Sequence, residues 1–120
     1  MSELDKSTES KIKQLQMVEQ SMSNLSVQRQ QFQSQLVEVN SAMDELKKTG
    51  SAYRIIGNVM FSSDKEEIDA DLSSKKEVLE LRIKNLEKQE DQIKEKAQKL
   101  QSEILTDMKG SDEDGHKAGN

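Results

Sequence analysis

The chain has 120 residues, of which 34% are charged and 2% are aromatic, and it contains no proline, cysteine or tryptophan. Two Phe and one Tyr give too little aromatic bulk for an ordinary globular core, and the lack of cysteine excludes a disulfide framework or a thiolate metal site. The net charge of −5, with lysines and carboxylates interspersed, argues against nucleic-acid binding. Composition therefore favours an extended, mainly α-helical protein, in which no proline obliges a helix to break.

No segment for membrane insertion or export is predicted. The longest apolar run, from Ile55 to Phe61, is too short to cross a bilayer, and residues 1–13 lack the apolar core of a signal peptide. We therefore expect a soluble protein of the cytoplasm.

A first long helix is predicted over residues 8–48. Apolar residues recur there at alternating steps of three and four, the heptad pattern of a coiled-coil seam, and Arg29 fills the one polar position. The apolar seam residues are Leu15, Val18, Met22, Leu25, Phe32, Leu36, Val39, Met43 and Leu46. Lys47 and Lys48 favour the carbonyl end of a helix and Gly50 suits the residue beyond it, so we expect this helix to end at residue 48.

A β-hairpin is predicted over residues 51–62, with Gly57 and Asn58 as its two-residue turn. In this register Ile56 lies opposite Val59. Both faces of the hairpin are rich in apolar side chains, and an isolated two-stranded hairpin is marginal in water. We therefore expect it to join partner strands from other chains. The alternative is a solvated turn that only connects two helices.

A second long helix is predicted over residues 64–108, because Ser63 and Glu66 have the spacing of a capping box at its start. Its seam residues are Leu72, Leu79, Ile83, Leu86, Ile93, Ala97, Leu100 and Ile104, with Glu90 in one polar position. The remaining residues, 109–120, are almost without apolar side chains, and we expect a disordered tail. The two helices then fold back as an antiparallel coiled coil within a single domain.

Side chains off the seam point to contacts with neighbouring subunits close to the hairpin. There the second helix is apolar over most of its circumference, so we expect neighbours to bury it. The residues assigned to subunit assembly are Tyr53, Ile55, Ile56, Val59, Met60, Phe61, Val78 and Leu81.

The opposite end of the coiled coil brings residues 8–15 near residues 100–108. The apolar seam ends there, because its next positions are Lys11 and Thr8. Apolar residues nevertheless persist, and those assigned to a binding tip are Ile12, Leu15, Met17, Leu100, Ile104, Leu105 and Met108. Two interpretations stay open: a surface that holds exposed apolar parts of another protein, or a frayed helix end with ordinary exposed side chains.

The two charged seam residues form a candidate register pair. An antiparallel fold-back centred on the turn brings Arg29 and Glu90 within about a helical turn of each other, and buried polar seam residues can fix register. The alternative is that both side chains extend separately to water.

Catalytic and metal-binding chemistry is not predicted. The chain has no phosphate-binding glycine loop and no Cys, and its single His116 lies in the expected tail, so no His or Cys can partner a nucleophile and no second imidazole is present. We expect neither an enzyme nor a cofactor.

The hairpin "AYRIIGNVMF" (residues 52–61) and the return helix "KKEVLELRIKNLEKQEDQIKEKAQKLQ" (residues 75–101), preceded by a long Gln-rich helix, resemble β-type subunits of prefoldin, most closely archaeal ones. The resemblance covers about residues 10–108. It implies an ATP-independent chaperone, a holdase, whose hairpins join an intersubunit β-barrel with an α-type subunit in a heterohexamer of two α-type and four β-type subunits. It also implies that the tips bind unfolded client proteins and pass them to a group II chaperonin.

Two classes of function are therefore compatible with the sequence. One is a holdase subunit that gains avidity from several weak tips. The other is a structural coiled-coil adaptor that binds a specific folded partner. Neither involves nucleic acid or a membrane as a partner.

Overall fold

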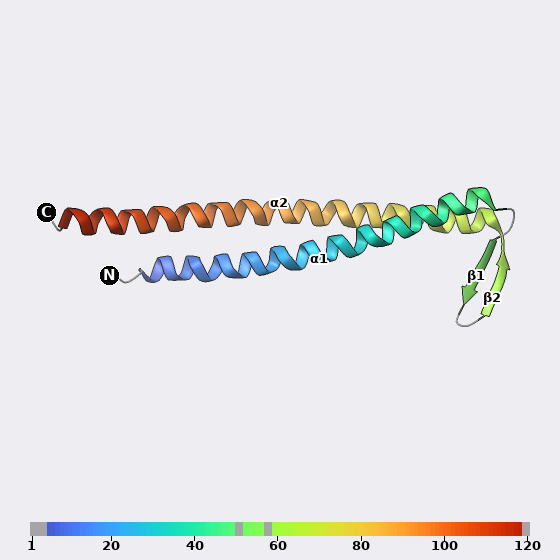
Figure 1. Cartoon of the computed structure of the whole chain (residues 1–120), viewed down its shortest axis with the longest axis horizontal. Coiled ribbons are helices and arrows are strands. Elements are labelled where there is room, and N and C mark those ends of the chain that lie inside the picture. The colour runs from blue at the N-terminus through green and yellow to red at the C-terminus, as the bar shows by residue number, and fades with distance from the viewer. Residues whose placement is uncertain (1–4, 50–51, 57–58, 119–120) are drawn as a thin grey trace. The chain divides into compact units, whose positions relative to one another are not determined.

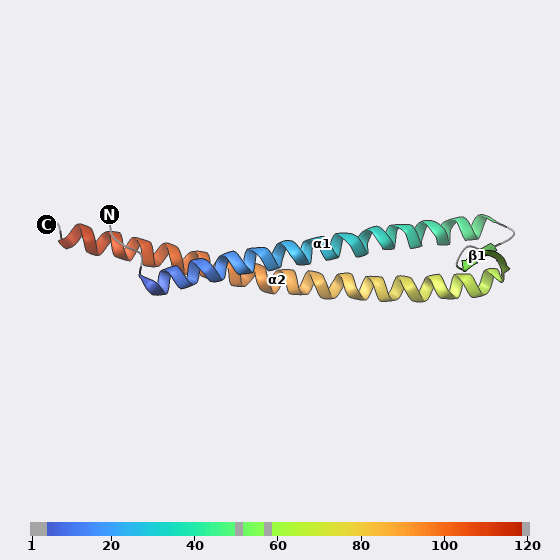
Figure 2. The same ribbon diagram turned by 90° about the horizontal axis from the view of Figure 1, so that it is seen from below.

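The computed structural model describes the backbone of residues 5–49, 52–56 and 59–118, and the side chains of residues 5–49 and 64–110. Two helices and two strands follow one another in the order α1, β1, β2, α2 (Figure 1). Their bounds are Lys6–Lys48 for α1, Ala52–Ile56 for β1, Val59–Ser63 for β2 and Lys65–Ala118 for α2. A second view shows that α1 is one continuous helix (Figure 2).

The carboxyl-terminal end of α2 differs from the predicted one. The sequence predicts an end at residue 108 and a disordered tail, whereas the helix continues to Ala118. No proline follows residue 108 to stop it, and extending an existing helix is far easier than starting one. The extension contains two glycines, Gly110 and Gly115, and each helical glycine weakens a helix by only about 1 kcal/mol.

The start of α2 is capped by Asp64. Its Oδ1 accepts a hydrogen bond from the backbone N–H of Glu66 at 3.1 Å, and its carbonyl oxygen accepts one from the N–H of Ile68 at 3.0 Å. The expected capping box placed the cap at Ser63, one residue too early. Serine and aspartate are almost equally good caps, so the sequence "SSDKEE" leaves the choice between neighbouring positions open.

The end of α1 is tied to the start of α2. Lys65 Nζ donates to the carbonyl oxygen of Thr49 at 2.9 Å, and Thr49 Oγ1 donates to the carbonyl oxygen of Leu46 at 3.4 Å. The last carbonyls of a helix have no partner within the helix, so these bonds satisfy two groups that the helix itself cannot. Gly50, expected just beyond α1, lies outside the described residues.

The strands β1 and β2 pair antiparallel. In this register Ala52, Tyr53, Arg54, Ile55 and Ile56 lie opposite Ser63, Ser62, Phe61, Met60 and Val59, respectively. The expected turn residues, Gly57 and Asn58, lie outside the described residues, and so do the side chains of both strands.

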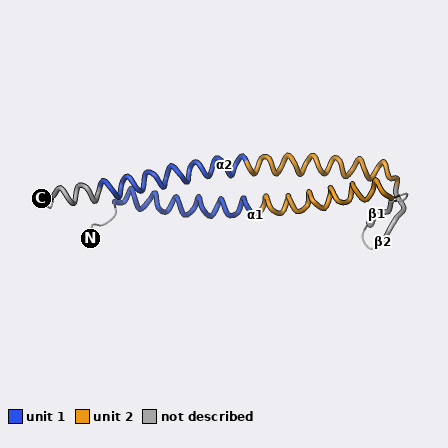
Figure 3. The backbone as a smooth tube through the Cα atoms, turned by 45° about the horizontal axis from the view of Figure 1, so that its top comes forward, with its two compact units in different colours: residues 1–26, 88–120 blue, residues 27–87 orange. Residues whose placement is uncertain are grey.

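The chain divides into two compact units, coloured separately in Figure 3: Met1–Ser26 with Lys88–Asn120 (unit 1), and Val27–Glu87 (unit 2). In unit 1, Thr8 of α1 is hydrogen-bonded to Asp107 of α2. In unit 2, the guanidinium of Arg82 lies 5.5 Å from the ring centre of Phe32, a cation–π contact between the helices. The helix segments within each unit are therefore antiparallel neighbours, as the fold-back predicts.

The predicted seam residues form the cores of both units. The buried ones are Val18, Leu100 and Ile104 in unit 1, and Val39, Leu46, Leu79, Ile83 and Leu86 in unit 2. Every other predicted seam residue is half-buried, whereas Val27 and Val37, which lie off the seam, are 50% and 64% exposed. The heptad prediction of a coiled coil is thus confirmed.

Two leucines on α2 provide a matched test of this core. Leu79 is 2% exposed and Leu81 is 59% exposed. We expect Leu79→Ala to lower the free energy of unfolding by about 2–4 kcal/mol, because it leaves a cavity in the core, and Leu81→Ala to change it by less than about 0.5 kcal/mol. Urea unfolding of the isolated chain, followed by circular dichroism, measures both. Equal losses would contradict the burial of Leu79.

A second test concerns the cap of α2. Asp64→Ala removes the acceptor for the Glu66 N–H, and we expect it to lower the free energy of unfolding by about 1 kcal/mol. Asp64→Asn keeps an acceptor oxygen at the same place and serves as the control. We expect it to lower the free energy of unfolding by no more than a few tenths of a kcal/mol. The same urea titration measures both, and an equally large loss in the control would exclude a capping role.

Candidate functional site

A polar cluster joins the two helices in unit 1. Thr8 Oγ1 donates to Asp107 Oδ2 at 3.2 Å, and Lys11 Nζ donates to the same oxygen at 2.8 Å. Lys11 Nζ also lies 3.9 Å from Glu103 Oε2. Thr8 is only 2% exposed, so its hydroxyl is satisfied by Asp107 rather than by bulk water. We call these four residues the tip cluster, and residues 6–17 of α1 with residues 100–110 of α2 the tip.

The charges in the tip cluster stabilise one another. The hydrogen bond from Lys11 holds the pKa of the Asp107 carboxyl below its ordinary value; partial desolvation opposes this, and the Lys11 charge and the Thr8 hydrogen bond add to it. The hydrogen bond to Asp107 raises the pKa of the Lys11 amine, against desolvation, with help from the charges of Asp107, Glu103 and Asp5. Both groups are therefore ionised at neutral pH.

The seven apolar residues assigned to the tip divide into three classes by exposure. Met17, Leu105 and Met108 are 71%, 58% and 43% exposed; Ile12 and Leu15 are half-buried; Leu100 and Ile104 are 7% and 9% exposed. The structure therefore brings Leu100 and Ile104 into the core of unit 1. Three side chains remain as an exposed apolar surface at the tip.

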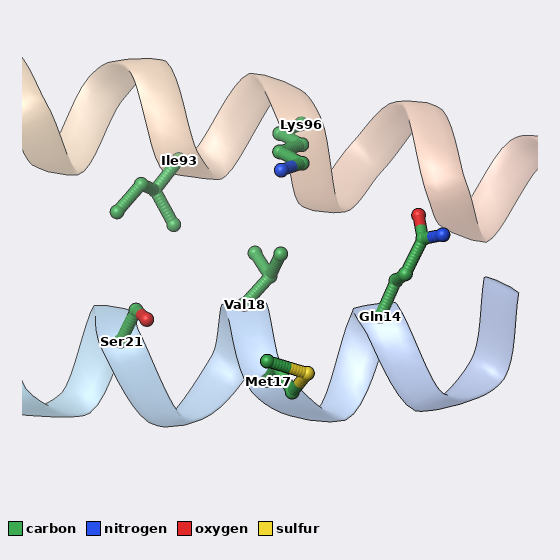
Figure 4. Close-up of a pocket in the computed structure, with 6 residues that line it drawn as sticks. All are labelled: Gln14, Met17, Val18, Ser21, Ile93 and Lys96. Carbon is green, nitrogen blue, oxygen red and sulfur yellow. The ribbon is translucent and has the colours of Figure 1, made fainter. Parts of the chain in front are cut away.

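A hollow of about 250 Å³ opens between the helices beside Met17 (Figure 4). Val18 and Ile93 point toward one another from α1 and α2, whereas Met17 lies beside α1 rather than between the helices. The complete lining is Gln14, Met17, Val18, Ser21, Ile93 and Lys96. The short side chain of Ser21 leaves part of this space unfilled.

A second hollow of about 290 Å³ shares Val18 with the first. Its lining residues are Val18, Glu19, Met22, Lys94, Ala97, Gln98 and Gln101. Ala97 is small for a seam position and fills little of the space that it lines together with Val18 and Met22. Apolar contact surface is thus accessible beside the seam as well as at the exposed tip residues.

The residues assigned to assembly are only partly described. Val78 and Leu81, three residues apart on α2 and so on one face of the helix, are 47% and 59% exposed. Both side chains are therefore accessible for contact with another chain. The side chains of Tyr53, Ile55, Ile56, Val59, Met60 and Phe61 lie outside those described, so the assembly assignment stays a prediction.

The register pair also stays a prediction. Arg29 is half-buried and its Nη1 donates to Oε1 of Gln33, one turn further along α1, at 3.2 Å. Glu90 is half-buried on α2. Half-burial of both charged groups is compatible with a role at the seam.

The tip cluster is the feature that the sequence analysis missed. The apolar seam does end at Leu15, but Lys11 and Thr8 continue its spacing with polar side chains that are half-buried and buried. On α2, Asp107 follows Ile104 at the three-residue step that the seam requires. The signal was therefore present as three polar residues at seam positions, Lys11 and Thr8 on α1 and Asp107 on α2, and a search for apolar residues alone could not find it.

In the part of the chain that the structure describes, no group of three or more His, Cys, Asp or Glu side chains is placed to hold a metal ion. Over these residues, neither α1 nor α2 has a stretch long and apolar enough to cross a membrane.

Comparison with known proteins assigns the chain to a family. The family model of the prefoldin subunit matches residues 9–111. Prefoldin subunit beta of Methanospirillum hungatei is 32% identical over 113 residues, which cover 92% of this chain and 94% of that protein. The corresponding subunit of Archaeoglobus fulgidus is 31% identical over 107 residues, covering 87% and 92% of the two chains.

A solved structure agrees with the sequence matches. The crystal structure of the prefoldin beta subunit from Thermococcus strain KS-1 matches with a TM-score of 0.84 and 28% sequence identity, covering 88% of this chain and 96% of that one. Sequence and fold therefore agree over most of the chain. The chain belongs to the prefoldin family of protein-folding chaperones, and within it to the archaeal β-subunit type.

Proposed function

We propose that this chain is a subunit of an ATP-independent holdase that captures non-native proteins at its coiled-coil tips and passes them to a group II chaperonin. Membership of the prefoldin family supports a role in protein folding. The observation that carries the capture step is the exposure of Met17, Leu105 and Met108 at the tip.

These side chains suit a binding surface for many different clients. Non-native proteins expose apolar side chains in no fixed arrangement, and burying such surface yields about 25 cal/mol per Å². Methionine is unbranched and polarisable, so Met17 and Met108 can adapt to irregular partners. A single tip of this size binds weakly. Several tips acting on one client gain affinity through the high effective concentration of the second and third contacts.

Assembly of several subunits into one complex brings several tips together. We propose that β1 and β2 join strands of other subunits in a β-barrel, within a heterohexamer of two α-type and four β-type subunits. In a two-stranded sheet each strand has one unpaired edge, which is available for pairing with a further strand. The exposed side chains of Val78 and Leu81 are then buried against a neighbouring subunit.

Substitution of the exposed tip residues tests capture. In the assembled complex we expect Met17→Ser with Leu105→Ser and Met108→Ser to raise the concentration needed to suppress aggregation of a denatured client by about an order of magnitude, because apolar area is lost at every tip. The control is Val27→Ser with Val37→Ser, which removes exposed apolar side chains from unit 2. Equal suppression by both complexes would reject tip capture and favour a structural adaptor.

A separate substitution tests assembly. We expect Leu81→Lys to reduce the yield of heterohexamer with an α-type subunit by at least about tenfold, because a charge would be buried without a partner. Val37→Lys makes the same change at an exposed position on α1 and should assemble normally. Native mass spectrometry of the mixed subunits measures both. A full yield of the Leu81→Lys heterohexamer would show that this face stays exposed in the complex.

A further inference from the structure

We propose that the tip cluster is a clasp that holds the ends of the two helices together, and that opening it enlarges the apolar surface offered to a client. This inference rests on the proposed function, because it specifies how the same tip is controlled. It concerns the polar residues Thr8, Lys11, Glu103 and Asp107, which the capture step itself does not use.

The geometry of the cluster is that of a cross-helix tie. One oxygen, Asp107 Oδ2, accepts hydrogen bonds from both Thr8 and Lys11, which lie three residues apart on α1. The carboxylate also lies beside the first turn of α1, where the positive end of the helix dipole favours a negative charge. At this level of the coiled coil, hydrogen bonds and charge take the place of apolar packing.

Such a tie is weaker than the core of unit 2. The side chains of Lys11 and Asp107 are 25% and 33% exposed, so water competes for their hydrogen bonds. Ion pairs with this degree of exposure contribute little to stability, whereas each buried leucine of a seam contributes much more. The tip should therefore open and close while the rest of the coiled coil stays packed.

Opening the clasp changes which apolar side chains of the tip are accessible to a client. In the closed form Leu100 and Ile104 are 7% and 9% exposed and Leu15 is half-buried. When the helix ends separate, these seam residues join Met17 and Leu105 as accessible apolar surface. A client that binds the open form better shifts the population toward it, and its apparent affinity is set by the fraction of open tips.

Added salt alone is a poor test of the clasp. Salt screens the charges of Lys11 and Asp107, but it also alters the strength of apolar contacts with the client. Substitutions separate the two effects. Asp107→Asn keeps the shape of the side chain and removes its charge, and Asp91→Asn makes the same change at an exposed position on α2, away from the tip cluster.

The first measurement is the distance between the helix ends. Because the chain contains no cysteine, nitroxide labels attach only at introduced sites, and Ser10→Cys with Thr106→Cys places them at exposed positions of the tip. We expect Asp107→Asn to lengthen and broaden the distance distribution of the full-length chain, and Asp91→Asn to leave it unchanged. The exchanged pair Lys11→Asp with Asp107→Lys restores an attraction between these two positions. It also brings a carboxylate at position 11 near Glu103 and a lysine at position 107 near the positive end of the α1 dipole, so it should reverse the lengthening in part.

The second measurement is client holding by the assembled complex. We expect Asp107→Asn to lower the complex concentration needed for half-maximal suppression of aggregation by about two- to fivefold, which is the gain expected when a weak closing interaction is removed. The exchanged pair should reverse part of the gain. Thr8→Val removes one hydrogen bond with little change in volume and should act in the same direction. If circular dichroism shows that Asp107→Asn loses helix content, Thr8→Val takes its place in both measurements.

The outcomes separate this inference from the proposed function. An unchanged distance distribution in Asp107→Asn overturns the clasp. A wider distance distribution with unchanged or weaker client holding overturns the link between clasp opening and client binding. If client holding still depends on Met17, Leu105 and Met108, the proposed capture at the tip stands. A wider distribution with stronger holding, both partly reversed in the exchanged pair, supports the clasp.

Discussion

The alternation of three- and four-residue steps between apolar residues is the constraint on which the rest of this structure depends. With few aromatic residues, the chain cannot fold around a globular core, and it buries apolar surface only by keeping one stripe of each helix against the other. Leu79, at 2% exposed, shows how completely that stripe can be covered. Because one narrow face is used for folding, the remaining faces are free to carry other functions.

Those other faces differ between the two units. Among the side chains that the structure describes, the buried residues of unit 2 are all apolar, and the exposed pair Val78 and Leu81 lies outside this core. Among those described in unit 1, the most buried is the polar Thr8, and the exposed large apolar side chains are those of the tip. A stable apolar core suits a region proposed to hold subunits together. A weaker, partly polar one suits a region proposed to accommodate different clients.

The sequence predicted the seam well because a periodic pattern repeated many times averages over local exceptions. It predicted the cap of α2 only to within one residue, because Ser63 and Asp64 have similar capping strength. It did not reveal the tip cluster, because the seam prediction counted only apolar residues, whereas Thr8 and Asp107 continue the seam spacing with polar side chains. The exposure of Met17 and burial of Ile104 depend on where each side chain lies relative to the partner helix.

The hydrogen bonds between the helices also suggest an order of folding. Lys65 and Thr49 are 16 residues apart in the chain, whereas Thr8 and Asp107 are 99 apart. Once the near pair has formed, each further layer closes only a small additional loop, so the entropy lost at each step is modest. Loop-closure entropy alone therefore favours early formation of the layer that contains Lys65 and Thr49, and late formation of the layer that contains Thr8.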